Sequence, residues 1–429
     1  MEEARNFVPD ITDYVAHPPP PTQTPTRFGR TFEAFAIHDF CLLWSSTVLS
    51  GFGQWGQQIS LNWLVYVLTG SAVQLGAVSF AAGLVGMAVT PFAGLLADRV
   101  PRRTILWISS SFGAATAVVI AFLVIVNLIE VWHAYAFSLI SGVTMAINQP
   151  ARQAAVFDTS TADTLQNAVA MNSLAQNLSR IVGPPFFGLI AVWSLGASFA
   201  LIVVMRGLAA AISFALSRQA RQTPPTTRRT NPFADIWDGF RYLITDARLT
   251  GLMVINSVPA FIVYPYLIFL PVFSDEVFGA EADVYGYLLA MMGVGSTIGL
   301  LALAALHNLQ HRGRWMLVGF LVYLVFITAF TQSDFLPLSL ILLIAAGIVH
   351  GLALALNTLL FQIHLRDDMR GRGMAAWQMG FSLMPLGALP MGIAIDRWGV
   401  QNGVGGFVIL CFFFFVLVAL FWRPLRNMN

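Results

Sequence analysis

The stretch Gly94-Leu-Leu-Ala-Asp-Arg-Val-Pro-Arg-Arg103 places four charged side chains in a short link between two long apolar runs. Three arginines and one aspartate are costly to leave in hydrocarbon, so we expect this link at a membrane surface. Arginine-rich loops stay on the cytoplasmic side, so the stretch predicts orientation as well as position. The link therefore predicts a chain that crosses a bilayer both before and after residues 94–103.

The composition extends this interpretation to most of the chain. Its 429 residues are 57% hydrophobic and 10% charged, with a mean hydropathy of +0.72. A soluble domain carries about a quarter charged residues, so most of this chain is predicted to lie in lipid. Cys41 and Cys411 lie far apart in apolar runs, which argues against a disulfide framework or a cysteine-based metal site. No metal and no cofactor are predicted.

Twelve segments are long enough to span about 30 Å of hydrocarbon. They lie near 37–66, 72–97, 104–128, 133–156, 166–192, 195–217, 248–273, 283–306, 314–332, 335–363, 373–395 and 403–422. Residues 1–35 are polar, contain a proline run, lack the pattern of a signal peptide and are predicted to form a disordered cytoplasmic tail. Residues 425–429 are predicted to form a second, short cytoplasmic tail.

The arginines predict which side of the membrane each link occupies. With the N terminus in the cytoplasm, the cytoplasmic links and tails hold 20 of the 23 basic residues, all arginine. The external links then hold Arg397 alone, and Arg180 and Arg206 lie inside helices. The opposite orientation would reverse this ratio, so both termini are predicted to be cytoplasmic.

The polar stretch 218–247 divides the chain into an N-terminal half, 36–217, and a C-terminal half, 248–424. Trp237, Phe240, Tyr242 and Leu243 within it have the spacing of an amphipathic helix on the inner membrane face. The halves also match each other in sequence. A shift of 210 residues superposes Ala72, Gly76, Gly83 and Arg102 on Ala282, Gly286, Gly293 and Arg312, and Asp98 on Asn308. The sequence therefore predicts an all-α membrane protein of twelve transmembrane helices in two six-helix repeats.

The spacing Gly-x-x-x-Asp-Arg-x-x-Arg-Arg resembles the loop between helices 2 and 3 of the major facilitator superfamily, which consists of secondary transporters. Three further stretches resemble its drug and siderophore exporters, such as the enterobactin exporter and macrolide efflux proteins: Asn148–Gln153, Asn167–Gly188 and Arg370–Ala375. Gly183, Pro184 and Gly188 resemble the antiporter signature of helix 5, although Phe187 replaces one of its paired glycines. The resemblance implies the major facilitator fold in a bacterial inner membrane.

In that superfamily the loop latches the two halves together at the cytoplasmic side. The resemblance implies that Asp98 approaches the start of helix 11 near Gly373, where the helix dipole favours an anion. Arg102 or Arg103 would reach Asp158 or Asp163, and Gly94 and Arg99 complete the motif. Pro101 stands where the family usually has glycine. A plain topogenic arginine cluster is the alternative.

Polar residues inside the predicted helices are candidates for a substrate cavity. Gln54, Gln58 and Asn62 recur every fourth residue, as do Asn172, Gln176 and Arg180, so each set is predicted to line one helix face. The candidates are Gln54, Gln58, Asn62, Asn148, Asn172, Gln176, Arg180, Arg206, Asn256, Tyr264, His350, Asn357 and Trp377. A mid-membrane arginine costs about 2.5–3.5 kcal/mol on insertion scales and should face water or a partner. Hydrogen bonding between helices is the alternative for the amides, and close packing within Gly347-x-x-x-Gly351 is the alternative for His350.

The resemblance implies export of amphipathic small molecules (a drug, macrolide or siderophore) by proton antiport with alternating access. No Asp or Glu lies near the middle of a predicted helix, so Asp39, Asp98 and His350 are the candidates for proton coupling. The expected partners are the substrate, protons and the lipid bilayer, with no nucleic acid, and the chain is expected to be a monomer. A lysophospholipid transporter of the same fold and a non-transporting sensor are the alternatives.

The sequence also argues against an enzyme. A phosphate-binding loop of the Gly-rich type needs a lysine, and the chain has none. It has no His-Glu-x-x-His and no Gly-x-Ser-x-Gly, the motifs of zinc peptidases and serine hydrolases. An ATP-driven pump and the usual membrane hydrolases are therefore disfavoured.

Overall fold

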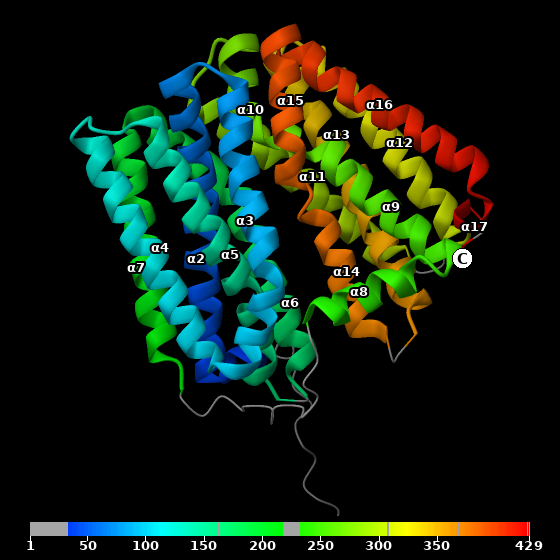
Figure 1. Cartoon of the computed structure of the whole chain (residues 1–429), viewed down its shortest axis with the longest axis horizontal. Helices are drawn as coiled ribbons and strands as arrows, with labels where there is room; N and C mark the ends of the chain where they lie inside the picture. Colours follow the sequence, from blue (N-terminus) through cyan, green and yellow to red (C-terminus); the bar gives the residue numbers. More distant parts are fainter. Residues whose placement is uncertain are drawn as a thin grey trace, which may run out of the picture.

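The computed structural model describes residues 33–161, 163–217, 232–306, 309–366, 369–426 and 428. Regular structure within these ranges is helical, and the long helices form two bundles side by side (Figure 1). Most of the predicted N-terminal tail lies outside the described residues. Its predicted end at residue 35 is wrong by a few residues, because Glu33–Ala36 form a 3-10 helix, η2, and the Ala34 N–H donates to Asn167 Oδ1 at 3.1 Å.

The N-terminal half consists of six long helices. They are α2 (His38–Thr69), α3 (Ala72–Arg99), α4 (Arg102–Ile125), α5 (Val131–Asp158), α6 (Leu165–Trp193) and α7 (Leu195–Ala215). Their boundaries agree with the first six predicted segments to within a few residues.

The C-terminal half contains two interrupted crossings. Its elements are α9 (Ala247–Ile262), η3 (Tyr264–Ile268), α10 (Leu270–Val272), η4 (Phe273–Val277), α11 (Ala282–Ala305), α12 (Arg312–Thr331), α13 (Leu336–His364), α14 (Arg370–Phe381), α15 (Met384–Trp398), α16 (Val400–Phe421) and α17 (Arg423–Arg426). Pro259, Pro265 and Pro271 remove backbone donors, so the seventh crossing becomes a series of short turns. The eleventh crossing breaks between α14 and α15, just before Pro385.

Nine helical stretches within the described residues are long and apolar enough to cross a membrane by length and composition. Three helices of the N-terminal half, α2, α5 and α6, are not among them. These same three carry Gln54, Asn148, Asn172 and Arg180. Their lower hydropathy reflects the polar residues that they carry, whereas other candidates, such as Arg206 of α7 and His350 of α13, lie in helices that are apolar enough to be counted.

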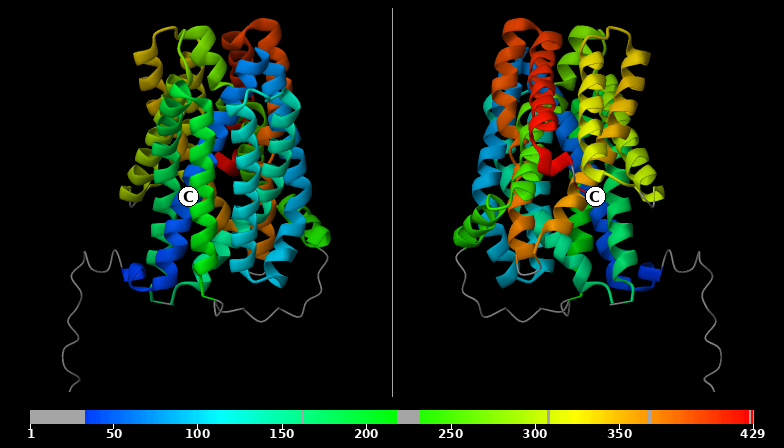
Figure 2. Two further views of the ribbon diagram at one scale, coloured as in Figure 1. Left: turned by 90° about the vertical axis from the view of Figure 1, so that its left-hand side faces the viewer. Right: turned by 90° about the vertical axis from the view of Figure 1, so that its right-hand side faces the viewer.

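The short helix α8 (Pro232–Leu243) falls where the amphipathic helix is predicted, and Figure 2 shows it lying at an angle to the long helices. Leu243 is buried whereas Trp237 is 70% exposed. Tyr242 accepts a hydrogen bond from the Arg366 N–H at 3.2 Å, and Asp238 lies 3.8 Å from Arg372. The second part of the linker is thus packed against the start of α14.

The C-terminal residues are folded as well, contrary to the predicted tail. Leu425 and Met428 are buried, and the Met428 carbonyl accepts a hydrogen bond from the Gly313 N–H at 3.1 Å. Leu425 and Met428 therefore pack at the start of α12, whereas a cytoplasmic tail is predicted for residues 425–429.

The two halves meet along two helix pairs, α3 with α15 and α6 with α11. We call the helix ends opposite the arginine-rich links the outer ends. A Cβ on Gly76 would lie 2.6 Å from the Ala388 carbonyl oxygen, and a Cβ on Gly392 would lie 2.6 Å from that of Ala72. Glycine therefore allows α3 and α15 to approach closely along their outer parts.

The helix 5 motif lies in the second pair. A Cβ on Gly188 would come within 2.6 Å of the Ala282 carbonyl oxygen, and Gly286 of α11 meets the Pro184 carbonyl in the same way. Phe187, which departs from the family pattern, is fully buried against Gly56 of α2. The large ring is accommodated because a small residue faces it.

Candidate functional site

A buried arginine organises the part of the N-terminal half that lies away from the outer ends of its helices. Arg152 of α5 is 4% exposed. Its guanidinium donates to the hydroxyls of Ser46, Thr47 and Ser50 at 3.3, 3.0 and 2.9 Å, and to Asn148 Oδ1 at 3.2 Å. These four partners are all neutral, so hydroxyl and amide oxygens stabilise the charge.

The count of arginines by membrane side places Arg152 with the cytoplasmic links, but the structure places it inside α5. The helix continues to Asp158, so Arg152 lies between one and two turns inside the bundle. Its position four residues after Asn148, on the same helix face, was the available signal. Asn148 also donates to Ser109 Oγ at 2.6 Å. Both residues therefore bind neighbouring helices, the alternative that the sequence left open.

Arg206 of α7 joins a second polar chain within the same half. It donates to Gln57 Oε1, and Gln57 donates to Ser141 Oγ, which links α7, α2 and α5. Its side chain fills the space left by two glycines, Gly53 and Gly113. Gln57, which the predicted stripe omits, is thus the amide that pairs with the arginine.

The predicted stripe on α2 divides between two environments. Gln54 and Gln58 are partly exposed, and Gln54 makes only a long contact with the Met145 sulfur at 3.7 Å. Asn62 is buried and donates to the hydroxyl of Tyr285 at 3.2 Å. This bond joins the two halves.

The predicted stripe on α6 does not share one environment either. Asn172 is buried, Gln176 is exposed and Arg180 is half-buried. Each fourth residue turns about 40° further around a helix, so eight residues carry a stripe well away from its starting face. Asn172 faces the packed bundle, whereas Arg180 lies against Gly293 of α11, at the seam between the halves.

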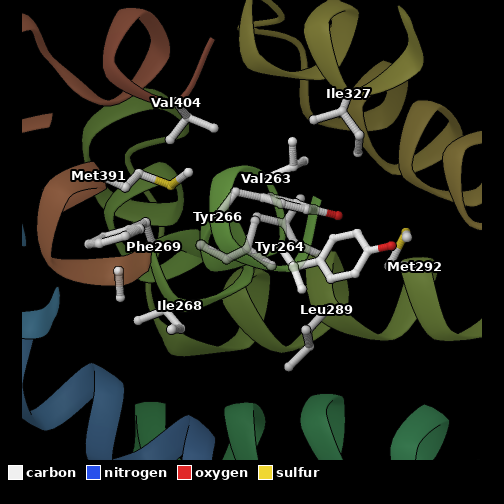
Figure 3. Packing of buried hydrophobic residues seen from close by; sticks show 14 of the residues in the cluster. Val263, Tyr264, Tyr266, Ile268, Phe269, Leu289, Met292, Ile327, Met391 and Val404 are labelled. Carbon is white, nitrogen blue, oxygen red and sulfur yellow. The ribbon is translucent and has the colours of Figure 1, made fainter. Parts of the chain in front are cut away.

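The C-terminal half contributes a buried aromatic cluster around His350. Its Nε2 lies 2.9 Å from the Tyr264 hydroxyl, and its ring centroid lies 4.8 Å from that of Tyr323. Figure 3 shows Tyr264 and Tyr266 packed among aliphatic side chains, with both hydroxyls directed to the same side. The hydroxyls of Tyr266 and Tyr323 are buried and lie close to each other, and the Nδ1 of His350 is buried without a hydrogen-bond partner among the described residues.

His350 also belongs to a close helix contact, which supports the packing alternative, while its place in a substrate cavity stays a prediction. A Cβ on Gly347 would lie 2.6 Å from the Met292 carbonyl oxygen of α11, and Gly351 is packed against Ser296. The glycines bring α13 onto α11, while the imidazole extends to Tyr264.

Asn256, Asn357 and Trp377 lie in the packed interior rather than along an open cavity. Asn256 donates to the Trp377 carbonyl at 3.3 Å, and Asn357 donates to the Leu252 carbonyl at 3.4 Å. Both asparagines are fully buried, and the Trp377 ring stacks on Phe361 at 4.5 Å. For these residues the structure favours a role in holding helices together.

Arg102 and Arg103, at the start of α4, make contacts within the N-terminal half. Arg102 forms an ion pair with Asp158 and donates to the Ala154 carbonyl at 3.2 Å. Arg103 donates to the Phe214 carbonyl and lies over that ring at 4.9 Å. These contacts tie α4 to α5 and α7.

The rest of the predicted latch stays a prediction. Gly94, Asp98 and Arg99 occupy the last turns of α3, and their side-chain surroundings lie outside what the structure describes. Asp39 accepts from the Ser217 N–H at 3.3 Å and from its hydroxyl at 3.0 Å, which joins the start of α2 to the end of α7.

A second acidic contact, which the sequence analysis missed, closes the outer side. Asp396, at the end of α15, accepts hydrogen bonds from the Ala72 N–H and from the Ser71 hydroxyl, both at 2.8 Å. Ser71 is the N-cap of α3, so the carboxylate sits at the positive end of that helix dipole. Beside it, the Tyr66 hydroxyl of the N-terminal half donates to Asp275 Oδ2 at 2.8 Å.

The signal for Asp396 was present in the sequence. Gly392-Ile-Ala-Ile-Asp-Arg397 repeats the spacing of Gly94-Leu-Leu-Ala-Asp-Arg99. The two stretches end α15 and α3, which pack antiparallel. The same motif therefore places one aspartate at each end of one helix pair.

Comparison with known proteins identifies the family. The chain matches the family of transmembrane secretion effectors over residues 30–428. It belongs to this family of major facilitator transporters.

Relatives of this family member include the staphyloferrin A transporter of Staphylococcus aureus, 26% identical over 383 residues, which cover 87% of this chain and 94% of the relative. Macrolide efflux protein A of Streptococcus pyogenes is 24% identical over 382 residues, with 87% and 93% covered. A bacterial homolog of the human lysosomal transporter Spinster has a TM-score of 0.72 at 14% identity, with 91% and 97% covered. At that identity the structural likeness shows the fold alone.

Family membership confirms the predicted major facilitator fold and the assignment to a transporter rather than an enzyme. This transmembrane secretion effector is a multi-pass membrane protein. The roles of individual residues, the energy source and the orientation stay predictions.

Proposed function

We propose that this transporter exports amphipathic small molecules of the drug, macrolide or siderophore type across a bacterial inner membrane. It works by alternating access, takes up protons in exchange, and keeps both termini in the cytoplasm. The staphyloferrin A and macrolide efflux relatives support the substrate type. The arginine distribution supports the orientation.

The observation that carries alternating access is the position of the contacts between the halves. Gly76 and Gly83 of α3 meet α15, and both lie in the outer half of α3. Gly188 of α6 and Gly286 of α11 likewise lie toward the outer ends of their helices. A carrier closed to the outside should have its halves joined at this level, and opening to the outside requires these contacts to part.

The acids of the outer seam are the groups best placed to couple this opening to protons. Asp275, Glu276 and Asp396 lie where external protons arrive and where the halves must separate. Burial, together with the charges of the other two carboxylates, raises the pKa of Glu276. A proton is therefore bound more tightly while the seam is closed. Asp98 stays the candidate for the inner side.

Everted membrane vesicles test the proposal. Vesicles that contain the protein should take up a fluorescent amphipathic dye when their interior is acidified, and a protonophore should stop the uptake. Vesicles from cells without the gene are the control. Uptake that continues after the gradient collapses contradicts antiport, and growth inhibition with a panel of compounds, with and without the gene, then narrows the substrate.

A further inference from the structure

The charged side chains more than one turn inside the described membrane-spanning helices of the N-terminal half have one sign. Arg180 and Arg206 lie near the middle of α6 and α7, Arg152 lies nearer the end of α5, and no Asp or Glu accompanies them at these depths. Arg152 and Arg206 are bound by hydroxyl and amide oxygens of their own bundle. Arg180 differs, because no hydrogen bond or ion pair joins its guanidinium to another residue in the described part of the chain.

Arg180 lies where the two halves face each other. It sits near the middle of α6, and its backbone and side chain contact Gly293 of α11. Its charge acts on both Tyr266 and His350, which belong to the opposite half. The side chain is half-buried. A guanidinium left without a partner at such a position is costly unless water or a ligand supplies an acceptor.

The opposite wall presents further polar groups. The hydroxyls of Tyr266 and Tyr323 are buried and lie close to each other. When the Tyr264 hydroxyl donates to Nε2 of His350, the neutral imidazole carries its proton on Nδ1. This Nδ1 is then a donor, and it has no partner among the described residues. Buried donors are almost always satisfied in native proteins. Together with Arg180, these groups supply several donors, and the acceptors among them are neutral hydroxyl oxygens rather than a carboxylate.

We infer that the cargo carries a carboxylate, which Arg180 binds at the seam while the Tyr266 side of the aromatic cluster receives the rest of an amphipathic molecule. This inference rests on the proposed export function. A guanidinium binds a carboxylate through two parallel hydrogen bonds, which fits a charge that has no acidic partner. A cationic amphiphile would instead meet uncompensated repulsion, so the site favours acids over amines.

Binding to the full-length protein in phosphatidylcholine nanodiscs tests the inference apart from transport. Carboxyfluorescein and rhodamine 123 share a ring system and differ in charge, and fluorescence anisotropy measures both. We expect carboxyfluorescein to bind about tenfold or more tightly than rhodamine 123, since a hydrogen bond to a charged group is worth at least that ratio. Equal binding, or tighter binding of the cation, overturns the inference.

Variants assign the preference to the site. Arg180→Gln should weaken carboxyfluorescein binding by about tenfold, and Tyr266→Phe should weaken it by a smaller factor. Arg314→Gln removes an equal charge from an exposed position at the start of α12 and should leave binding unchanged. If Arg180→Gln fails to fold, Arg180→Lys replaces it, because it retains the charge and loses only the paired donors. Unchanged binding in both Arg180 and Tyr266 variants contradicts the inference.

Two further arms separate the remaining sources of binding. Phosphatidylglycerol in the nanodisc should leave carboxyfluorescein binding unaltered. Displacement of carboxyfluorescein by this lipid would show that the site binds a lipid headgroup instead. Charge-selective binding without dye uptake in everted vesicles would refute the proposed export and leave the carboxylate site standing. Uptake of rhodamine 123 but not of carboxyfluorescein would support the proposed export and refute the carboxylate site.

Discussion

Replacing Asp396 by asparagine should open the outer seam. The carboxylate accepts two hydrogen bonds at 2.8 Å from the start of α3, one from Ala72 N–H and one from the Ser71 hydroxyl. The Asp396→Asn change keeps the shape of the side chain but removes its charge and one acceptor oxygen. Both losses act only when α15 and α3 are together, so the change should weaken the closed state selectively.

The magnitude follows from those contacts. A hydrogen bond to a charged group contributes about 1.5–3 kcal/mol when buried, and an anion at a helix N terminus contributes about 0.3–1 kcal/mol. Asp396 is exposed, so solvent screening reduces both contributions. We expect a loss of about 1–2 kcal/mol, which shifts the equilibrium between closed and open outer sides by about 5- to 30-fold.

Double electron–electron resonance, which measures the distance between two spin labels, provides the assay. The labels are attached to cysteines introduced at Leu128, after α4, and Phe335, before α13, which are exposed at the outer ends of opposite halves. The native cysteines, Cys41 and Cys411, are replaced beforehand. The Asp396→Asn protein should show a larger fraction of long distances between the labels.

Asp334→Asn is the matched control for this change. Asp334 is an outer carboxylate that accepts from Gln401 Nε2 at 2.6 Å within the same half, so its loss should leave the distances unchanged. If Asp396→Asn and Asp396→Ala both leave the distribution as in the wild type, the outer-latch reasoning is wrong.

Three further predictions use the same protein. Gly392→Ala should open the outer seam and destabilise the closed state by about 1–3 kcal/mol, because the new Cβ meets a carbonyl oxygen at 2.6 Å. Gly406→Ala is the control and should be neutral, because nothing lies within 4 Å of its Cβ. The distances between the spin labels measure both effects. Arg152→Gln should lower the thermal unfolding midpoint of the purified protein by removing about 2–4 kcal/mol of hydrogen bonding, and an unchanged midpoint would show that the network is dispensable. Lowering the external pH should favour short distances, because the raised pKa of Glu276 makes the closed seam bind a proton more tightly than the open one, and stabilisation is lost as pH rises through that pKa. Glu276→Gln should abolish this response, and a persisting response would assign it to another group.

Some features of this transporter follow from short stretches of sequence. The arginines at 99, 102 and 103 mark one membrane face, and each apolar run marks a crossing, because the cost of moving a side chain into lipid is nearly independent of distant residues. The match between residues 72–102 and 282–312 indicates the duplicated halves in the same way. Such local, additive quantities were sufficient for the fold.

Contacts between side chains depended on the packed structure. The partners of Arg152 could not be predicted, because nothing nearby in sequence shows that Ser46 and Thr47 face it. The stripe from Asn172 to Arg180 broke up because neighbouring helices cover only part of its arc. The motif around Asp396 can be recognised in the sequence, but its partner Ala72 lies 324 residues away, so the contact could not be predicted.

The sequence by itself therefore determined the twelve crossings, the repeat and the kinds of polar group inside the membrane. Only the tertiary structure decided which of those groups are satisfied. Arg152 and Arg206 have partners and Arg180 has none in the described chain, and that difference depends on how separate helices pack. The physical reason is range: hydropathy acts residue by residue, whereas a hydrogen bond requires two atoms within about 3 Å of each other.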